Sequence, residues 1–109
     1  GVHDVAVLSV TPDATQVKVG AVVNITVVVK NEGEYIETFD VMVYRNDALI
    51  ENKTVNLLSP GDQITKTFRW DTTNVMLGNY TLSAKASVIP GETDTSDNVY
   101  DNGVVEIVS

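Results

Sequence analysis

The 109-residue chain contains no cysteine and a single histidine. Without cysteine it can form neither disulfides nor zinc–thiolate sites, and thiol catalysis is excluded. The histidine, His3, lies at the start of the chain, and the sequence predicts no catalytic or metal-binding role for it. No Ser/His/Asp arrangement is visible apart from this residue. Because acid–base chemistry needs positioned groups in a sheltered cleft, the sequence argues against a hydrolase.

Positive charge is also scarce. The chain carries 7 Lys and Arg against 15 Asp and Glu, which gives a net charge of −8. Nucleic acid is therefore not an expected partner, because a phosphate backbone needs a cationic surface. Anionic membrane surfaces are disfavoured by the same sign. No apolar run is long enough to span a bilayer, so we expect no membrane insertion.

The length fits one ordered domain. A chain of 109 residues is typical of a single compact unit, and it buries roughly two thirds of the surface that its unfolded form exposes. The first residues, GVHDV, include neither a Met nor an apolar signal segment. We therefore expect residues 1–109 to be a single module excised from a longer protein.

Apolar and polar residues alternate along most of the chain. In AVVNITVVVKN the apolar series is Val23, Ile25, Val27 and Val29. Similar alternation runs through TFDVMVYRN, ITKTFRW and GNYTLSAKASV, and turn signals with Pro, Gly or Asn separate the segments. Each such segment predicts a strand with one face in the core. About seven short strands in a chain of this length predict an all-β, antiparallel immunoglobulin-like sandwich.

The alternation also assigns sides to particular residues. Trp70 is in phase with Phe68 and is expected in the core. Tyr80, which opens the GNY strand, is predicted to form a tyrosine corner, in which the hydroxyl returns to upstream backbone. If seven strands alternate in direction, the first and last run the same way. The two termini then leave from opposite ends of the sandwich.

Three segments resemble one family. They are VVVKNEGEYIETFDVMVYRND, then LSPGDQITKTFRWDTTNVMLGNYTLSA, then an acidic stretch before the last strand. In this order and spacing they resemble the cell-adhesion-related domain found in bacteria and archaea, CARDB, from about Val5 to Val108. The resemblance implies an extracellular immunoglobulin-like module, repeated or appended within large surface proteins and secreted enzymes. It implies no catalytic activity of the module's own.

The acidic stretch VIPGETDTSDNVYDN, residues 88–102, contains no Lys or Arg. Calcium takes roughly six to eight oxygen ligands, and Glu92, Asp94 and Asp97 are the candidate calcium ligands here. The stretch does not match an EF-hand loop. We favour the alternative of a solvated loop, because Asp, Asn, Ser and Thr hydrogen-bond their own backbone in turns.

The resemblance bears on the same stretch. Family members often carry an Asp, a Glu and a paired Asn-Asn in the last hairpin. In this chain Glu92 takes the Glu position and Asn98 that of the first Asn. Ser87 stands about where the Asp would be, and Val99 replaces the second Asn. These departures weaken the prediction of a metal site that would be based on the resemblance to relatives.

Two further sets of residues are candidate surface sites. Met42 and Tyr44 point outward by parity and would share a sheet face with Thr81, Ser83 and Lys85. An exposed aromatic on such a face can contact a sugar ring or a neighbouring module. Three N-x-T sequons make Asn24, Asn52 and Asn79 candidates for glycosylation.

The sequence therefore predicts a non-catalytic structural or adhesion module, extracellular or at the cell surface, that mediates protein interaction or spacing within a larger protein. The expected partners are neighbouring domains of the same chain or other surface proteins, and the expected state is a monomer. No cofactor is expected apart from the candidate calcium. The alternative is a carbohydrate-binding accessory module of a secreted enzyme, which needs an aromatic platform. Tyr35, Tyr44 and Tyr100 are its candidates.

Overall fold

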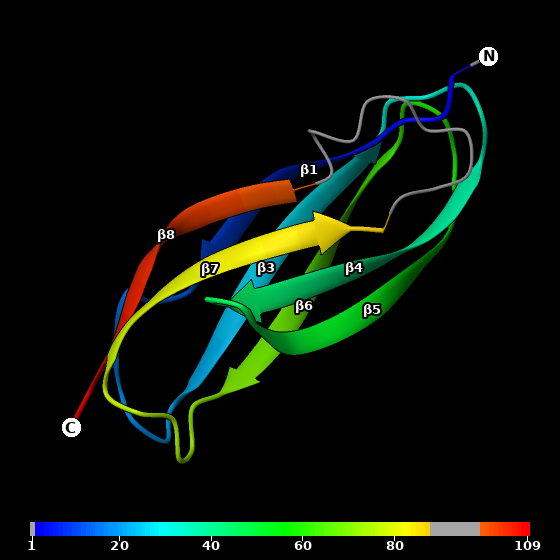
Figure 1. The fold of residues 1–109 in the computed structure, drawn as a ribbon. Coiled ribbons are helices and arrows are strands. Elements are labelled where there is room, and N and C mark those ends of the chain that lie inside the picture. The colour runs from blue at the N-terminus through cyan, green and yellow to red at the C-terminus, as the bar shows by residue number, and fades with distance from the viewer. Residues whose placement is uncertain (1, 88–98) are drawn as a thin grey trace.

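Figure 1 shows the computed structural model as an elongated sandwich of two β-sheets. The structure describes residues 2–87 and 99–109, and for residues 99–102 it describes the backbone alone. The molecule measures 51 × 19 × 17 Å. Its termini lie at opposite ends of the long axis (Figure 1), as strand parity predicted.

Eight strands build the two sheets. They are β1 (Val5–Pro12), β2 (Gln16–Lys18), β3 (Val22–Asn31), β4 (Glu37–Arg45), β5 (Ala48–Leu58), β6 (Gln63–Asp71), β7 (Gly78–Ala86) and β8 (Val99–Val108). One sheet has the order β1-β3-β6 and the other the order β2-β8-β7-β4-β5. The described residues form no helix. The predicted fold class, an all-β immunoglobulin-like sandwich, is confirmed.

The count of about seven strands was one too low, and β2 is the strand that it missed. This strand has three residues, which are too few to show a period of two. It pairs in parallel with the end of β8, whereas the other strand pairs are antiparallel. The side chains join as well, because Gln16 Nε2 donates a hydrogen bond of 2.9 Å to Glu106 Oε1.

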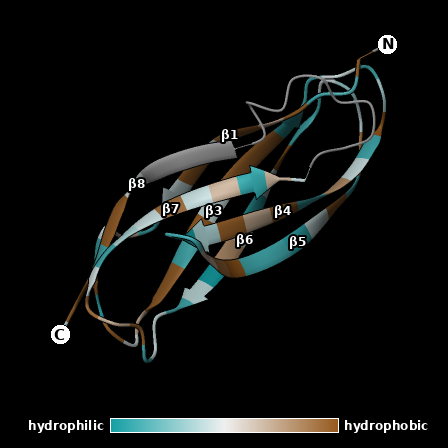
Figure 2. Ribbon diagram, in the orientation of Figure 1, coloured by the Kyte–Doolittle hydropathy of each residue, from teal (hydrophilic) through white to brown (hydrophobic). Residues whose placement is uncertain are grey.

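The core lies between the inner faces of the two sheets, and hydrophobic residues recur along the strands that enclose it (Figure 2). In β3 the residues predicted to face inward, Val23, Ile25, Val27 and Val29, are all 0% exposed. Trp70 is 3% exposed, which confirms its predicted place in the core. Burying a Val or Ile side chain contributes roughly 1.5–3 kcal/mol, so this alternation supplies most of the driving force for folding.

Two charged side chains span the gap between the edge strands β5 and β6. Lys53 Nζ donates a hydrogen bond of 2.6 Å to the carbonyl of Thr67. Glu51 Oε1 accepts a hydrogen bond of 3.2 Å from the backbone N–H of Arg69. Both residues are paired with core-facing positions of β4. Inward-pointing charges of this kind discourage a foreign strand from pairing with the edge.

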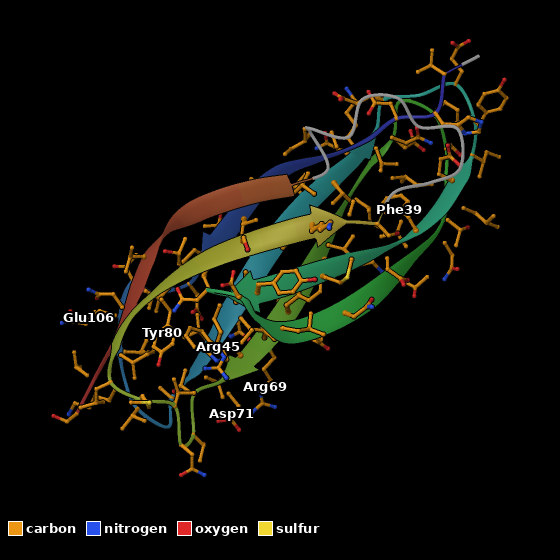
Figure 3. The ribbon with its side chains drawn as sticks, viewed as in Figure 1. Phe39, Arg45, Arg69, Asp71, Tyr80 and Glu106 are labelled. Carbon is orange, nitrogen blue, oxygen red and sulfur yellow. The ribbon has the colours of Figure 1, made fainter. Side chains whose placement is uncertain are left out.

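Tyr80 forms the predicted tyrosine corner. Its hydroxyl donates a hydrogen bond of 2.6 Å to the carbonyl of Met76. Its ring meets Trp70 edge to face, with centroids 5.5 Å apart and planes at 72°. The guanidinium of Arg45 lies 5.9 Å from the Trp70 centroid and 5.8 Å from the Tyr80 centroid (Figure 3). These contacts fix the connection between β6 and β7.

Replacing Tyr80 by Phe keeps the ring and removes the hydrogen bond to the Met76 carbonyl. We expect Tyr80→Phe to lower the free energy of unfolding by about 0.5–1.5 kcal/mol, the usual net worth of one hydrogen bond. Urea denaturation measures the loss. Tyr44→Phe is the matched control, because the hydrogen bond of the Tyr44 hydroxyl within the described residues goes to the weakly accepting sulfur of Met42, at 3.5 Å. Equal losses in both variants would contradict the role of the corner.

Candidate functional site

The outer face of the five-stranded sheet carries the predicted pair Met42 and Tyr44. In the register of β4 and β7, Met42 is opposite Lys85 and Tyr44 is opposite Ser83. The shared sheet face is therefore confirmed. Both Met42 and Tyr44 are half-buried on this face, so the aromatic ring is only partly available to a ligand.

A shallow hollow of about 220 Å³ opens beside Tyr44, lined by Tyr44, Asn46, Asp47, Ser83 and Lys85. The turn between β4 and β5 forms its rim and is tied to β7. The Asn46 N–H donates to the carbonyl of Thr81 at 2.8 Å, and the Thr81 N–H donates to Asn46 Oδ1 at 3.0 Å. Asn46 has a φ of 52°, a left-handed conformation that Asn tolerates better than most residues.

The lining of the hollow suits hydrogen bonding better than catalysis. It offers a phenol, an amide, a hydroxyl, one ammonium and one carboxylate. It contains no histidine, and its volume is below the roughly 300–1,000 Å³ of typical small-molecule pockets. The hollow can accept a sugar hydroxyl or a polar side chain of a partner. It does not provide the sheltered acid–base pair that hydrolysis requires.

His3 is part of a cluster that the sequence did not predict. Its Nδ1 lies 2.7 Å from Glu37 Oε2, and its ring stacks on Tyr35 with centroids 4.3 Å apart and planes at 16°. Glu37 is 9% exposed, so His3 supplies a hydrogen-bond partner to a buried carboxylate. The two residues are 34 positions apart, and no local pattern links them.

The backbone beside His3 is attached to the loop between β3 and β4. The Glu34 N–H donates to the carbonyl of Val2 at 2.8 Å, and the Glu32 N–H donates to the carbonyl of Asp4 at 2.9 Å. Between them, Gly33 lies so close to the N-terminal segment that a Cβ would be 2.6 Å from the Val2 oxygen. Only glycine allows this approach.

The remaining predicted site residues fall into two groups. The candidate calcium ligands Glu92, Asp94 and Asp97 lie outside the described residues. Within residues 2–87 and 103–109, no three His, Asp or Glu side chains are grouped so as to hold a metal ion. The sequon residues Asn24, Asn52 and Asn79 are all exposed. Glycosylation at these positions stays a prediction.

Two observations refine the surface predictions. Asn24 Nδ2, the atom that a glycan would join, donates a hydrogen bond of 3.3 Å to Asp13 Oδ2. Tyr35 precedes the nine-residue strand β4, whereas Tyr44 is near its end, so the two rings are roughly 30 Å apart along the strand. They do not form one platform, and the side chain of Tyr100 lies outside the described part of the chain.

These features define an immunoglobulin-like sandwich with a filled core and shallow surface sites. A family model described as CARDB matches residues 3–102, and the chain belongs to this family of non-catalytic modules. A search of curated proteins finds no match. In the part of the chain that the structure describes, no helix is long and apolar enough to cross a membrane.

Three solved structures illustrate the similarity. The CARDB domain of a Pyrococcus furiosus protein, crystallised in complex with di-metal ions, is 28% identical with a TM-score of 0.79, over 98% of this chain and 90% of that domain. A domain of a Methanosarcina acetivorans protein, whose name refers to the cell surface, is 22% identical with a TM-score of 0.76, over 99% of this chain and 94% of that domain.

The third is a β-glucosidase from Erythrobacter marinus, 15% identical with a TM-score of 0.77. The match covers 97% of this chain but only 16% of the enzyme. The shared fold is therefore an accessory domain of that protein. At this identity the similarity concerns the fold alone.

The close approach at Gly33 predicts the effect of a single methyl group. We expect Gly33→Ala to push residues 2–4 off the β3–β4 loop, with a loss of about 1–3 kcal/mol typical of overpacking. Amide hydrogen exchange measures it through faster exchange at Glu32 and Glu34. The control is Gly103→Ala, since a Cβ at Gly103 meets nothing within 4 Å. Unchanged exchange at both amides in Gly33→Ala would disprove the steric argument.

Proposed function

We propose that this domain is a non-catalytic spacer and interaction module of a larger cell-surface or secreted protein. The observation that carries the proposal is its shape, a rod 51 Å long with the two termini at opposite ends (Figure 1). A rod of this kind adds a fixed length between whatever precedes and follows it. The filled core between the sheets keeps that length constant, because close-packed interiors resist compression.

An extracellular location and adhesive contacts are part of the same proposal. The name of the Methanosarcina acetivorans protein supports the location. The absence of cysteine is compatible with both an oxidising and a reducing compartment. The partners that we propose are neighbouring domains of the same polypeptide or other surface proteins. The domain itself acts as a monomer, and its net charge of −8 favours solubility over self-association.

The hollow beside Tyr44 supports a second candidate, a carbohydrate-binding accessory module. Its hydroxyl, amide and charged groups suit sugar hydroxyls, and the β-glucosidase from Erythrobacter marinus carries the same fold as 16% of its chain. The spacer is favoured because, among the residues that the structure describes, one aromatic ring, that of Tyr44, lines the hollow. A stacking platform for a sugar chain usually needs a broader aromatic surface.

The proposed spacer function predicts that the distance between the two ends of the domain has a single, fixed value. Because the chain has no cysteine, Glu34→Cys with Lys18→Cys places two unique spin labels at exposed positions near opposite ends. Double electron–electron resonance is expected to give one narrow distance distribution, comparable to the 51 Å long axis. Both single-cysteine variants serve as controls for intermolecular distances. A broad distribution, or one with several peaks, would contradict a spacer of fixed length.

The two candidates differ in their response to sugars. Titration with a β-linked gluco-oligosaccharide, followed by amide NMR, is expected to leave the resonances of Tyr44, Ser83 and Lys85 unchanged. Saturable shifts at these residues that disappear in Tyr44→Ala would favour the carbohydrate-binding module instead. Asn52→Ala, which changes an exposed residue of the neighbouring strand β5 outside the lining of the hollow, is the control for a general surface effect.

A further prediction concerns whether Glu92, Asp94 and Asp97 bind calcium. The Pyrococcus furiosus domain was crystallised in complex with di-metal ions, whereas this chain has Ser87 and Val99 at two of the positions where the family often carries Asp and Asn. On the basis of these two sequence differences we expect the same melting midpoint in millimolar calcium and in chelator. A higher midpoint in calcium, with amide shifts confined to residues 92–101, would assign a metal-binding loop instead.

A further inference from the structure

The short strand β2 joins the last strand close to the C-terminal end of the sandwich. Its three residues pair in parallel with residues 106–108 of β8. Backbone bonds extend this junction at both ends. The Glu106 N–H donates to the Thr15 carbonyl at 2.8 Å, and the Val19 N–H donates to the Val108 carbonyl at 2.8 Å. Because β8 also pairs with β7 along its other edge, the last part of β8 is held on both sides.

The side chains of β2 add little to the hydrophobic core. Gln16 and Lys18 are exposed, and Val17 is only partly buried against the core. In contrast, the inward residues Val105 and Ile107 of β8 are at most 1% exposed. Since hydrophobic stabilisation is roughly proportional to the apolar area that is buried, the contribution of β2 to the fold consists mainly of its hydrogen bonds to β8.

The directions of the terminal strands decide how these hydrogen bonds respond to a pull on the two ends. The strands β1, β2 and β8 all run toward the end of the molecule where the C-terminus lies (Figure 1). A pull on the N-terminus draws β1, and through it β2, backward, whereas a pull on the C-terminus draws β8 forward. The parallel strands β2 and β8 are then displaced in opposite directions along their axes. The hydrogen bonds between them run across the strands, so they are loaded together in shear.

The connection from β1 to β2 is fixed by Asp13. The Asp13 N–H donates to the Asn24 carbonyl at 2.9 Å. The Asp13 carboxylate accepts hydrogen bonds from the Asn24 N–H at 3.2 Å and from Asn24 Nδ2 at 3.3 Å. The chain thus passes from one sheet to the other at a point that is bound to β3. A pull that reaches β2 through β1 also strains these bonds.

The first strand is itself anchored along its length. It pairs with β3 from Val5 to Pro12, and its inward residues Val5, Val7 and Val10 are at most 5% exposed. Because β1 starts near the N-terminus and runs toward the other end (Figure 1), a pull on the N-terminus acts along this ladder. Its hydrogen bonds are therefore also loaded in shear, and they do not open one after another from an end.

We propose that this module bears tension applied between its two ends, and that the parallel pair β2–β8 is a clamp that resists unfolding under this tension. The inference rests on the proposed spacer function, because a rod between other domains transmits any force that separates them. The clamp joins the first segment of the chain directly to the last. Its hydrogen bonds break together under a pull along the rod, and a barrier made of several bonds is crossed more slowly than single bonds in sequence.

The test compares two directions of pulling in optical tweezers. Because the chain has no cysteine, Val2→Cys with Ser109→Cys provides two unique attachment points and a pull along the rod. Met76→Cys with Ser109→Cys instead pulls across β8, because the β6–β7 loop lies at the C-terminal end (Figure 1) and leads into Gly78, which pairs with Ile107. This second pull opens the pairs of β8 one by one. At equal constant force we expect the pull along the rod to unfold the domain at least about tenfold more slowly, as several hydrogen bonds broken together would require.

One substitution weakens the clamp alone. The Ala21 N–H donates to the Lys18 carbonyl at 3.0 Å, and Gly20 has a φ of 96°. This is the pattern of a type II turn, in which Val19 occupies the first corner, a position that favours proline. Val19→Pro therefore keeps the turn and removes the N–H that binds the Val108 carbonyl. Under the pull along the rod we expect its unfolding rate to rise roughly two- to tenfold, the effect of losing one hydrogen bond from the barrier.

Thr38→Val is the matched control, because it also removes one hydrogen bond, which the Leu57 N–H donates to Thr38 Oγ1 at 3.1 Å. This bond joins β4 to β5, and neither is a terminal strand. Thr38→Val should therefore unfold under the pull along the rod at the same rate as the unmodified sequence. Amide NMR checks that both variants are folded, and the comparison of the two pulling directions requires neither of them.

Equal unfolding rates in the two pulling directions would overturn the inference. So would a folded Val19→Pro variant whose rate under force is unchanged, or is raised no more than that of Thr38→Val. These outcomes leave the spacer function intact, since the distance between the spin labels is measured without force. A broad distance distribution would instead refute the spacer.

Discussion

The packing of the two inner sheet faces against each other is the interaction on which the rest of the structure depends. The inward residues of β3 and β4 are almost completely buried. The hollow beside Tyr44 lies on the outer face of the five-stranded sheet. Close packing also makes the domain rigid, which is the property that a rod between other domains requires.

A sandwich of this kind has exposed edges and ends that need separate solutions. At one edge, Lys53 and Glu51 reach from β5 to backbone groups of β6. At the other side, the short strand β2 covers the end of β8. At the ends, hydrogen bonds from Asn31 and Tyr80 order the loops. The edges are thus protected by polar groups, whereas the ends present apolar side chains.

The family comparison gives this contrast a biological setting. The same fold occurs as an isolated domain of a Pyrococcus furiosus protein and as 16% of a β-glucosidase chain. The same fold thus occurs in proteins of different kinds. The role that we propose for this chain is based on its elongated shape and on surface features such as the Tyr44 hollow.

The sequence by itself determined the core and the sides of the strands. Alternation placed Trp70 inside, Met42 and Tyr44 outside, and Tyr80 at its corner, because a period of two is a local property of an extended chain. Only the tertiary structure revealed β2, since three residues carry no period. It alone brought His3 to Glu37. These contacts join residues far apart in the sequence, and their partners are chosen by how the two sheets pack rather than by any local pattern.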